Sequence, residues 1–359
     1  MILKHPLKTL TAAALGQSVL AGGMITAAQA ADITLRATAN SNEQDEDYDG
    51  LVVFKNYVEN ASNGEIAVEL YIGTQLCSTG EECLQGVADG SIDIYISTSG
   101  GAASIFPFIQ VLDLPYLMND DRVAESVLTE TSFTQTMRDM AMEASGGAIR
   151  LMTIGNTGGW RSFANTEHTV RTPADLEGLK LRTVPADLPQ ELTTALGASP
   201  TPIPWPELFT SLQTGVVEGT ANGITDIMNM KFPDAGLTYL TLDNHAYMGA
   251  FWWMSEESFQ GLTPEQRRIV VDGFYQLQQA TFASPQRKSI EAYEAFTAAG
   301  GEIYVPTQEE KDAFAEAAQP VYEWFTANVD GGEAALEALE AAVSEVETDL
   351  QSQYDAELN

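Results

Sequence analysis

The chain has 359 residues and carries 17 Lys and Arg against 51 Asp and Glu, a formal net charge of −34 at pH 7. A surface this acidic repels nucleic acid and anionic membranes, so neither is expected as a partner. The length allows two lobes rather than one core, and a bound anion would need local arginines in a closed cleft, where solvent screens their charge poorly.

The first thirty residues, 1–30, predict a signal peptide. Lys4 and Lys8 precede small and apolar residues that end in Ala-Gln-Ala, the small-x-small pattern of a signal-peptidase site. We expect cleavage before Ala31 and export. An N-terminal membrane anchor is the alternative, but the apolar stretch is interrupted at residues 16–18 and is short for a bilayer span. No later segment is long and apolar enough to cross a membrane.

Two runs of alternating strand and helix patterns follow. The first comprises strands at 33–37, 66–72 and 92–96 and helices at 50–59 and 82–88. The second comprises strands at 148–154, 179–184 and 217–220 and helices at 188–196 and 206–213. Each rhythm is typical of a parallel sheet covered by helices, in which ligands gather beyond the carboxyl ends of the strands. The sequence therefore predicts two α/β lobes around a cleft.

The rest of the chain is predicted to be helical. A long helix is expected over 263–299, where Pro285 should kink or divide it. Two further helices are expected at 307–328 and 333–350.

The two cysteines, Cys77 and Cys83, predict a disulfide, because an even, closely spaced pair in an exported protein is usually oxidised. The bridge would fix the loop that enters the helix at 82–88. A zinc site is not expected, since His168 and His245 are the only histidines beyond the signal peptide and lie at no ligand-like spacing.

An acidic segment, 43–49, leaves three interpretations open. From Asp45 to Gly50 it matches the front half of a calcium-binding loop, but the twelfth position is Asn56 instead of Glu. The acids could instead lie at the N-terminus of a helix, where negative charge suits the helix dipole. In the third interpretation Glu43, Asp45 or Asp47 reaches the cleft and meets a cationic group of a zwitterionic ligand.

Arg182 is the leading candidate for a binding residue. It lies in the short apolar run 179–184 (LKLRTV), which predicts a largely buried strand, and a buried arginine needs an anionic partner. That partner could be an internal carboxylate or an anionic ligand. Arg161 follows a Gly-rich turn after the 148–154 strand, so it could face the cleft or pair with a surface acid.

Three further side chains are candidates for the cleft. Ser97 and Thr98 follow the third strand and offer hydroxyl groups. Trp205 stands between two prolines in PIPWPELF, a rigid loop, whereas Trp252 and Trp253 are expected to pack in the core.

The motifs of common catalytic sites are missing from the sequence. It contains no G-x-S-x-G elbow, no Walker A sequence and no G-x-G-x-x-G fingerprint. Neither histidine beyond the signal peptide is obviously paired with Ser or Cys. Catalysis is therefore not expected, and neither is a cofactor or a metal.

Three segments resemble the substrate-binding subunit of tripartite ATP-independent periplasmic (TRAP) transporters, the DctP family. They are LDLPYLMNDDRVAESVL (112–128), DLEGLKLR (175–182) and ALGASPTPIPWPELFTSLQTGVVEG (195–219). The resemblance implies a two-lobed periplasmic binding protein fold with a central ligand cleft and a long helix linking the lobes. Lobe I would comprise 31–155 and about 245–282, and lobe II would comprise 156–244 and about 283–359 with the C-terminal helices.

The resemblance also implies roles for four residues. Arg182 would form a bidentate salt bridge with a ligand carboxylate, because its planar fork matches two oxygens. Arg161 would be a second contact to the same group, and Trp205 would cover the ligand. Asn222 in VVEGTAN matches the last position of the family's V-D-G-x-E-N pattern, although Glu218 and Ala221 depart from it. Without the resemblance, Asn222 before Gly223 would be an ordinary turn residue.

The function that follows is a periplasmic protein that captures a small organic carboxylate and delivers it to the membrane subunits of a transporter. A zwitterionic compatible solute, such as an ectoine-like molecule, is the alternative ligand, suggested by Trp205 and the acidic segment. A secreted hydrolase or lyase acting on a small organic acid is the alternative function.

Overall fold

The structure of the protein, a computed structural model, describes residues 31–129 and 131–358. The predicted signal peptide lies outside the described residues. Nine strands of the described chain form one mixed sheet, in the order β2-β1-β3-β8-β4-β7-β5-β6, with β9 beside β8. The strands are β1 (Ile33–Ala39), β2 (Ile66–Ile72), β3 (Ile94–Thr98), β4 (Ile149–Asn165), β5 (Lys180–Thr183), β6 (Ser199–Pro202), β7 (Gly219–Asn222), β8 (Tyr239–Ser255) and β9 (Glu302–Tyr304).

The helices divide among three parts of the chain. The first part holds α1 (Glu46–Ala61), α2 (Gly80–Ala88), α3 (Ser99–Ala102), η1 (Pro107–Asp113), α4 (Asp121–Leu128) and α5 (Ser132–Ala144). The middle holds η2 (Pro173–Leu176), α6 (Asp187–Ala195), η3 (Trp205–Glu207), α7 (Leu208–Gln213), α8 (Ile224–Asn229) and η4 (Phe232–Ala235). The last part holds α9 (Glu256–Gly261), α10 (Pro264–Ala298), α11 (Gln308–Asn328) and α12 (Gly332–Leu358).

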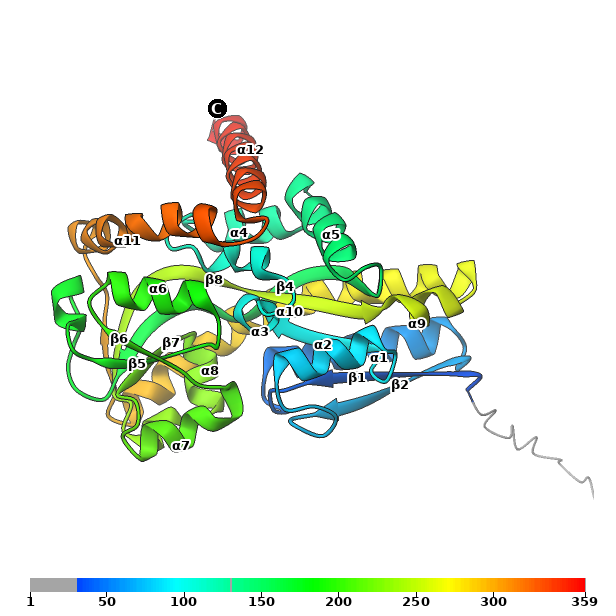
Figure 1. The fold of residues 1–359 in the computed structure, drawn as a ribbon, viewed down its shortest axis with the longest axis horizontal. Helices are drawn as coiled ribbons and strands as arrows, with labels where there is room; N and C mark the ends of the chain where they lie inside the picture. Colours follow the sequence, from blue (N-terminus) through cyan, green and yellow to red (C-terminus); the bar gives the residue numbers. More distant parts are fainter. Residues whose placement is uncertain (1–30, 130, 359) are drawn as a thin grey trace, which may run out of the picture. The chain divides into compact units, whose positions relative to one another are not determined.

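Each end of the sheet is a parallel α/β unit, as the sequence rhythm predicts. β1 pairs in parallel with β2 and β3, and β5 pairs in parallel with β6 and β7. Figure 1 shows α1 and α2 with the first unit and α6, α7 and α8 with the second. No helix in the described ranges is long and apolar enough to span a bilayer.

Two antiparallel strands of 17 residues each, β4 and β8, join these units. The sequence predicts a strand that ends at Ile154, where β4 continues, and it does not predict β8. β4 continues to Asn165 through a bulge between Asn156 and Trp160, where Gly158 and Gly159 both have φ of +82°. Arg161 therefore lies within a strand, not after the end of one.

β8 contributes side chains to the hydrophobic core on both faces of the sheet. Trp252 and Trp253 are both fully buried, and because neighbouring strand residues point to opposite faces, they pack into different hydrophobic clusters. Trp252 joins the cluster of Phe54 and Phe274, whereas Trp253 stacks on Phe106 with ring centroids 4.6 Å apart. Both tryptophans serve as core residues, as the sequence analysis expected.

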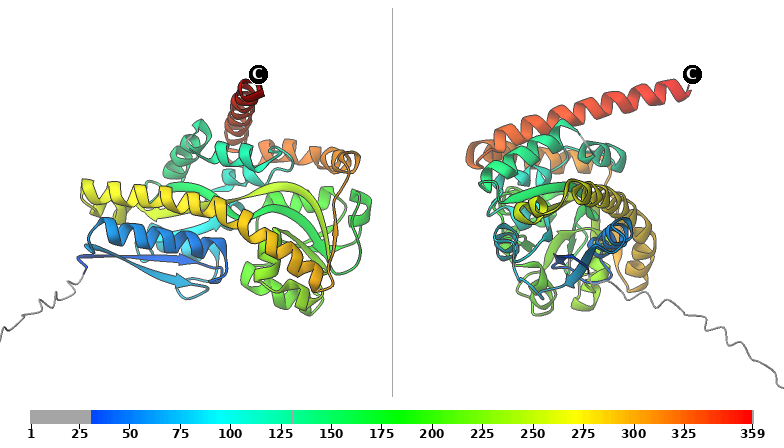
Figure 2. Two further views of the ribbon diagram at one scale, coloured as in Figure 1. Left: turned by 180° about the vertical axis from the view of Figure 1, so that it is seen from behind. Right: turned by 90° about the vertical axis from the view of Figure 1, so that its right-hand side faces the viewer.

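The long predicted helix is confirmed as α10, which is continuous through Pro285. It contacts α1 and β4 as well as α8 and β9, so it packs against both units. Figure 2 shows α10 changing direction where its colour turns from yellow to orange. The proline thus does not divide the helix.

Candidate functional site

A cavity of about 340 Å³ is lined by residues from both α/β units. Six of the seven side chains predicted for the site line this one cavity: Ser97, Thr98, Arg161, Arg182, Trp205 and Asn222. They come from β3, β4, β5, η3 and β7, so the sheet order brings together residues that are far apart in sequence.

Glu43, the seventh, does not line the cavity. It is exposed in the turn before α1, whereas Asp45 and Asp47 are buried and line the cavity. The prediction that Glu43 itself contacts a ligand finds no support in this placement, because the residue precedes the N-cap at which the chain turns inward.

Arg182 is only 5% exposed, and its Nε donates to the carbonyl oxygen of Ile203 at 2.8 Å. It forms no ion pair with any carboxylate of the described residues, so an internal salt bridge does not account for its burial. Burial lowers its pKa to about 9, and the positive charge of Arg161 adds to this effect, while Asp226 opposes it. The guanidinium therefore stays charged at neutral pH.

Arg161 is 9% exposed, which excludes the alternative of a surface ion pair. Its Nη1 donates to the carbonyl oxygen of Ala221 at 2.9 Å, and its Nη2 lies 3.6 Å from Oδ1 of Asp113. Its buried Nε has no hydrogen-bond partner among the described residues. Two arginines with unused donors thus lie on the same wall of the cavity.

Asn222 lies in β7 opposite Ser162 of β4 and is buried, so it is not a turn residue. Its Oδ1 accepts a hydrogen bond from the Thr220 hydroxyl at 2.8 Å, and its Nδ2 donates to Oδ2 of Asp226 at 3.2 Å. One amide hydrogen of Nδ2 is left for a ligand acceptor.

Trp205 begins the short turn η3, between Pro204 and Pro206, which also line the cavity. Its ring packs edge-on against Phe232 with centroids 5.6 Å apart, and the Arg182 guanidinium carbon lies 5.6 Å from its ring centroid. The indole thus borders the space beside the guanidinium, where it can cover the carbon skeleton of a ligand.

The opposite wall comes from β3 and the loop before α2. Ser97 Oγ accepts a hydrogen bond from Trp253 Nε1 at 2.8 Å, and Thr98 Oγ1 accepts one from the Gly101 amide at 3.2 Å. Because both hydroxyl oxygens already accept a bond, their own hydrogens remain to be donated. Ligand oxygens can therefore be bound on this side as well.

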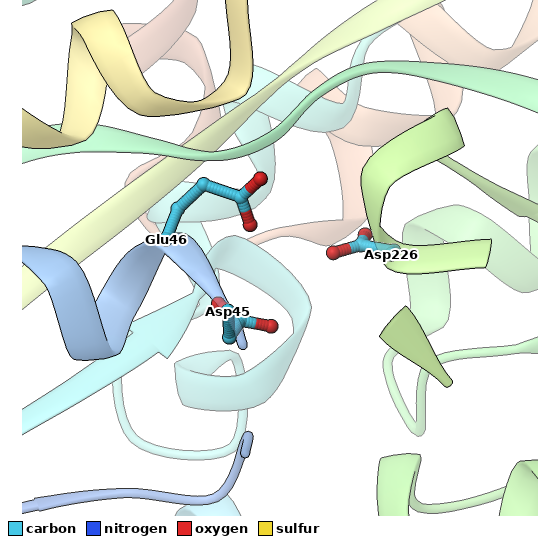
Figure 3. Close-up of side chains that lie close together, drawn as sticks. All are labelled: Asp45, Glu46 and Asp226. Carbon is cyan, nitrogen blue, oxygen red and sulfur yellow. The ribbon is translucent and has the colours of Figure 1, made fainter. Parts of the chain in front are cut away.

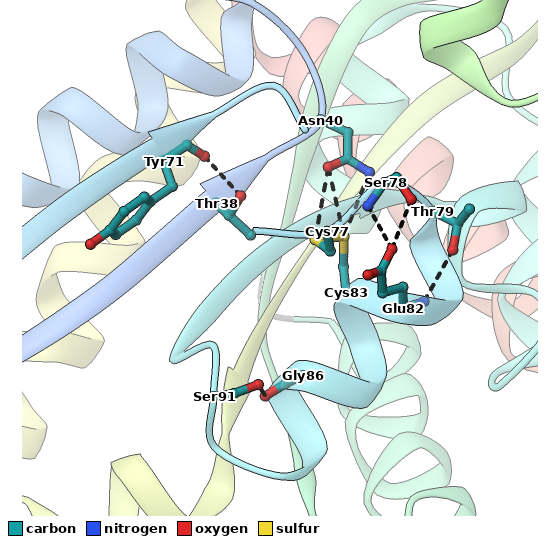
Figure 4. The surroundings of a disulfide bond; sticks show 10 residues. All are labelled: Thr38, Asn40, Tyr71, Cys77, Ser78, Thr79, Glu82, Cys83, Gly86 and Ser91. Carbon is teal, nitrogen blue, oxygen red and sulfur yellow. Dashed lines mark hydrogen bonds between the residues drawn. A yellow bond between two sulfur atoms is a disulfide. The ribbon is translucent and has the colours of Figure 1, made fainter. Parts of the chain in front are cut away.

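A disulfide between Cys77 and Cys83 confirms the predicted pairing, with the two Cα atoms 5.2 Å apart. Figure 4 shows it beside Asn40, whose Nδ2 lies 3.6 Å from the Cys83 sulfur. The bridge closes the loop that supplies residues 78–81 to the cavity wall. The Thr79 side chain accepts a hydrogen bond from the Glu82 amide at 3.2 Å and caps α2.

We expect replacement of both cysteines by serine to lower the free energy of unfolding by about 2 kcal/mol, because the closed loop is short. Urea unfolding of the double variant and the wild-type protein measures the difference. Mass spectrometry after alkylation without reduction tests the bond itself. Two alkylated thiols in freshly prepared native protein would contradict it.

Four buried acids lie close to one another near the two arginines, and all but Glu46 line the cavity. They are Asp45, Glu46, Asp47 and Asp226. Burial is the largest cause that raises the pKa of each, and repulsion within the group adds to it for the first three: Glu46 reaches about 7 and Asp47 about 8. Asp226 receives the hydrogen bond of Asn222, which partly offsets its rise. These four carboxylates therefore repel one another when they are ionised.

The acidic segment is not a calcium-binding loop of the predicted type, because α1 begins at Glu46. Asp45 is its N-cap and accepts a hydrogen bond from the Asp47 amide at 3.0 Å, which fits the second interpretation. Asp47 lies in the first turn and lines the cavity. It therefore reaches the cleft, as the interpretation with a zwitterionic ligand requires.

Sequence reasoning missed Asp226, which lies in α8, four residues after Asn222. Two glycines make room for it. A Cβ on Gly158 would lie 2.5 Å from Asp226 Oδ2, and a Cβ on Gly223 would lie 1.6 Å from the Gly158 carbonyl oxygen. The Asn-Gly pair in the sequence was the available signal, since it marks a close backbone approach as well as a turn.

A cavity between two α/β units that share one sheet, lined by buried arginines, defines a two-lobed solute-binding protein. A family model for bacterial extracellular solute-binding proteins, family 7 (DctP), matches residues 37–328. The chain belongs to this family of TRAP transporter solute-binding proteins, which confirms the resemblance seen in the sequence.

The relatives bind different solutes, according to their names. The chain is 27% identical over 311 residues to the 2,3-diketo-L-gulonate-binding periplasmic protein of Escherichia coli, covering 86% of this chain and 91% of the relative. It is 27% identical over 328 residues to the ectoine-binding periplasmic protein of Halomonas elongata, covering 89% and 91%.

The fold is that of solved binding proteins of the same kind. The sugar-acid-binding protein of Advenella mimigardefordensis, solved in complex with galactonate, superimposes with a TM-score of 0.81 at 23% identity. The match covers 89% of this chain and all of that one, 100%. The two-lobed periplasmic binding protein fold expected from the sequence is therefore confirmed.

Proposed function

We propose that this protein is the periplasmic subunit that captures a small organic carboxylate and delivers it to the membrane subunits of a TRAP transporter. The observation that carries the proposal is Arg182, a buried cation that lines the cavity and has no carboxylate partner among the described residues. A buried charge without a partner is costly, so its retention implies an anion that arrives from outside.

In this proposal the ligand carboxylate lies against the cavity wall that contains Arg161 and Arg182. Arg182 provides the planar fork, and Arg161 and Asn222 donate further hydrogen bonds from β4 and β7. Trp205 covers the carbon skeleton, and Ser97 and Thr98 contact the ligand from the other lobe. Hydrogen-bond donors in a desolvated cavity attract the carboxylate more strongly than the distant acidic surface repels it, because salt screens the charge of that surface.

The protein would perform no chemistry. Binding would shift an equilibrium between open and closed lobes, because residues of both units contact the same ligand. The division into lobe I (31–155 with about 245–282) and lobe II (156–244 with about 283–359) remains part of the proposal. Export to the periplasm rests on the predicted signal peptide and on the family.

A thermal-shift screen tests the ligand class, because a solute bound only by the native state raises Tm. Sugar acids, dicarboxylates and hydroxy acids should raise Tm, and the matching uncharged amides should not. Equal shifts from acids and amides would contradict a carboxylate site. A zwitterionic solute is the alternative, and ectoine belongs in the screen because Asp45 and Asp47 line the cavity.

The bound solute should be recovered unchanged after the protein is denatured. Mass spectrometry of the released ligand distinguishes a binding protein from a hydrolase or lyase. A chemically altered product that forms only with the native protein would overturn the assignment.

A further inference from the structure

Three carboxylates from two distant segments point into one small space beside the solute cavity. Asp45 and Glu46 begin α1, and Asp226 lies in α8, on the other α/β unit. One oxygen atom from each lies within 4.8 Å of the other two. Figure 3 shows the Glu46 and Asp226 carboxylates facing each other, with the Asp45 carboxylate directed to the same space.

The Glu46 carboxylate provides the second, independent indication of a ligand. The residue is fully buried, with 0% of its surface exposed, and neither of its oxygens has a hydrogen-bond partner among the described residues. The Thr225 hydroxyl lies close enough to Glu46 to lower the pKa of its carboxyl, but the two make no hydrogen bond of ordinary geometry. Buried acceptors are rarely left without a partner in a native protein, so this arrangement favours a bound group that contacts oxygen.

The cations near these carboxylates are engaged elsewhere. Lys288 forms an ion pair with Asp49 at 2.8 Å and donates to the carbonyl oxygen of Gln44 at 2.6 Å. Arg161 is directed to Asp113 and to a backbone carbonyl. No ion pair joins Asp45, Glu46 or Asp226 to a basic side chain within the described ranges. Lys288 acts on Glu46, and Arg161 and Arg182 act on Asp226, only through longer-range attraction, and the pKa values of both acids stay raised.

We propose that Asp45, Glu46 and Asp226 form a calcium site that bridges α1 and α8 at the edge of the solute cavity. Oxygen-only ligands suit a hard cation. Oxygens no more than 4.8 Å apart fit around an ion that binds them at about 2.3–2.6 Å. Calcium also tolerates the irregular geometry of donors from two segments, whereas magnesium demands a near-ideal octahedron.

A compact ion fits this position better than a positively charged group of the solute. Glu46 is not among the residues that line the solute cavity, whereas Asp45 and Asp226 are. A solute in the cavity would therefore leave Glu46 without a partner, and a small ion between the three carboxylates would not. The site goes beyond the proposed function, because it requires no particular solute.

Calorimetric titration of the chelator-treated, metal-free protein with CaCl₂ tests the site. We expect one calcium per chain with an apparent Kd on the order of 10⁻⁴ M, typical of extracellular calcium sites. Calcium should raise Tm by a few degrees. Glu46→Gln should weaken calcium binding at least about tenfold, and Asp226→Asn should do the same. Glu46→Gln should also raise Tm of the metal-free protein, because it removes a repulsive charge.

Two controls make the result decisive. Glu309→Gln removes an exposed acid from the first turn of α11, as Glu46→Gln removes a buried one from the first turn of α1, and should leave calcium binding unchanged. Arg182→Ala should keep the calcium response, so a wrong solute assignment would not affect this test. No binding to the wild-type protein would overturn the site. So would an equal response to MgCl₂, or undiminished binding by Glu46→Gln and Asp226→Asn.

Discussion

Arg182→Ala should abolish solute binding and leave the fold intact. The substitution removes the buried fork that would hold the ligand carboxylate, a loss of roughly 3–5 kcal/mol or at least a hundredfold in affinity. The fold should not suffer, because the arginine has no ion pair within the described residues and its burial opposes its charge. The free energy of unfolding of the ligand-free variant should equal or exceed that of the wild-type protein.

Arg182→Lys should be nearly as harmful, because an ammonium group cannot contact two carboxylate oxygens as a planar fork does. Isothermal titration with the best solute from the screen measures both variants. Arg268→Ala is the matched control, since Arg268 is an exposed arginine of α10. An affinity within about threefold of wild type for either Arg182 variant would refute the role, given that a lost charged partner costs far more.

Local patterns predicted the parallel units well, because strand and helix periods are short-range properties. The predicted strands at 33–37 and 66–72 lie within β1 and β2, and the predicted helix at 307–328 matches α11 with its N-cap, Thr307. The long β4 and β8 strands were beyond such reasoning. β4 crosses a bulge at Gly158 and Gly159, which looks like a terminating turn in the sequence. β8 is apolar almost throughout its second half, since both of its faces are buried, so it shows no alternation.

Arg182 could be predicted, because a charged residue in a buried strand is conspicuous and needs a partner. Arg161 was expected after a strand instead of within one, and its role came from the family resemblance. The acidic side chains could be predicted only in part: Asp45 and Asp47 were candidates for the cleft, whereas Glu46 and Asp226 were not. Asp226 and Glu46 meet only because α8 folds against β4 and α1 lies across the cavity, a contact between segments 180 residues apart that no local pattern encodes. The exposed position of Glu43 has a related lesson: the sequence shows that the segment is acidic, but not which of its side chains turn inward.

The junction that places Asn222 and Asp226 should be the most sensitive backbone position of the site. Gly223 separates β7 from α8, and its Cα approaches β4 so closely that an added Cβ would lie 1.6 Å from the Gly158 carbonyl oxygen. This neighbour is backbone, so a side-chain rotation cannot relieve the clash. Gly223→Ala should therefore displace α8 or the bulge of β4, and it should lower the free energy of unfolding by about 3 kcal/mol, the upper end for overpacking.

The same displacement should weaken solute binding, because Asn222 precedes Gly223 and Arg161 bonds the carbonyl of Ala221 in the same short strand. Gly261→Ala is the matched control: an added Cβ there meets no atom within 4 Å, so stability should change by less than about 0.5 kcal/mol. Urea unfolding and isothermal titration of the two variants measure both effects. If Gly223→Ala proved as stable as Gly261→Ala, β4 and α8 could not be packed as tightly as described, and the placement of Asp226 opposite Glu46 would lose its structural basis.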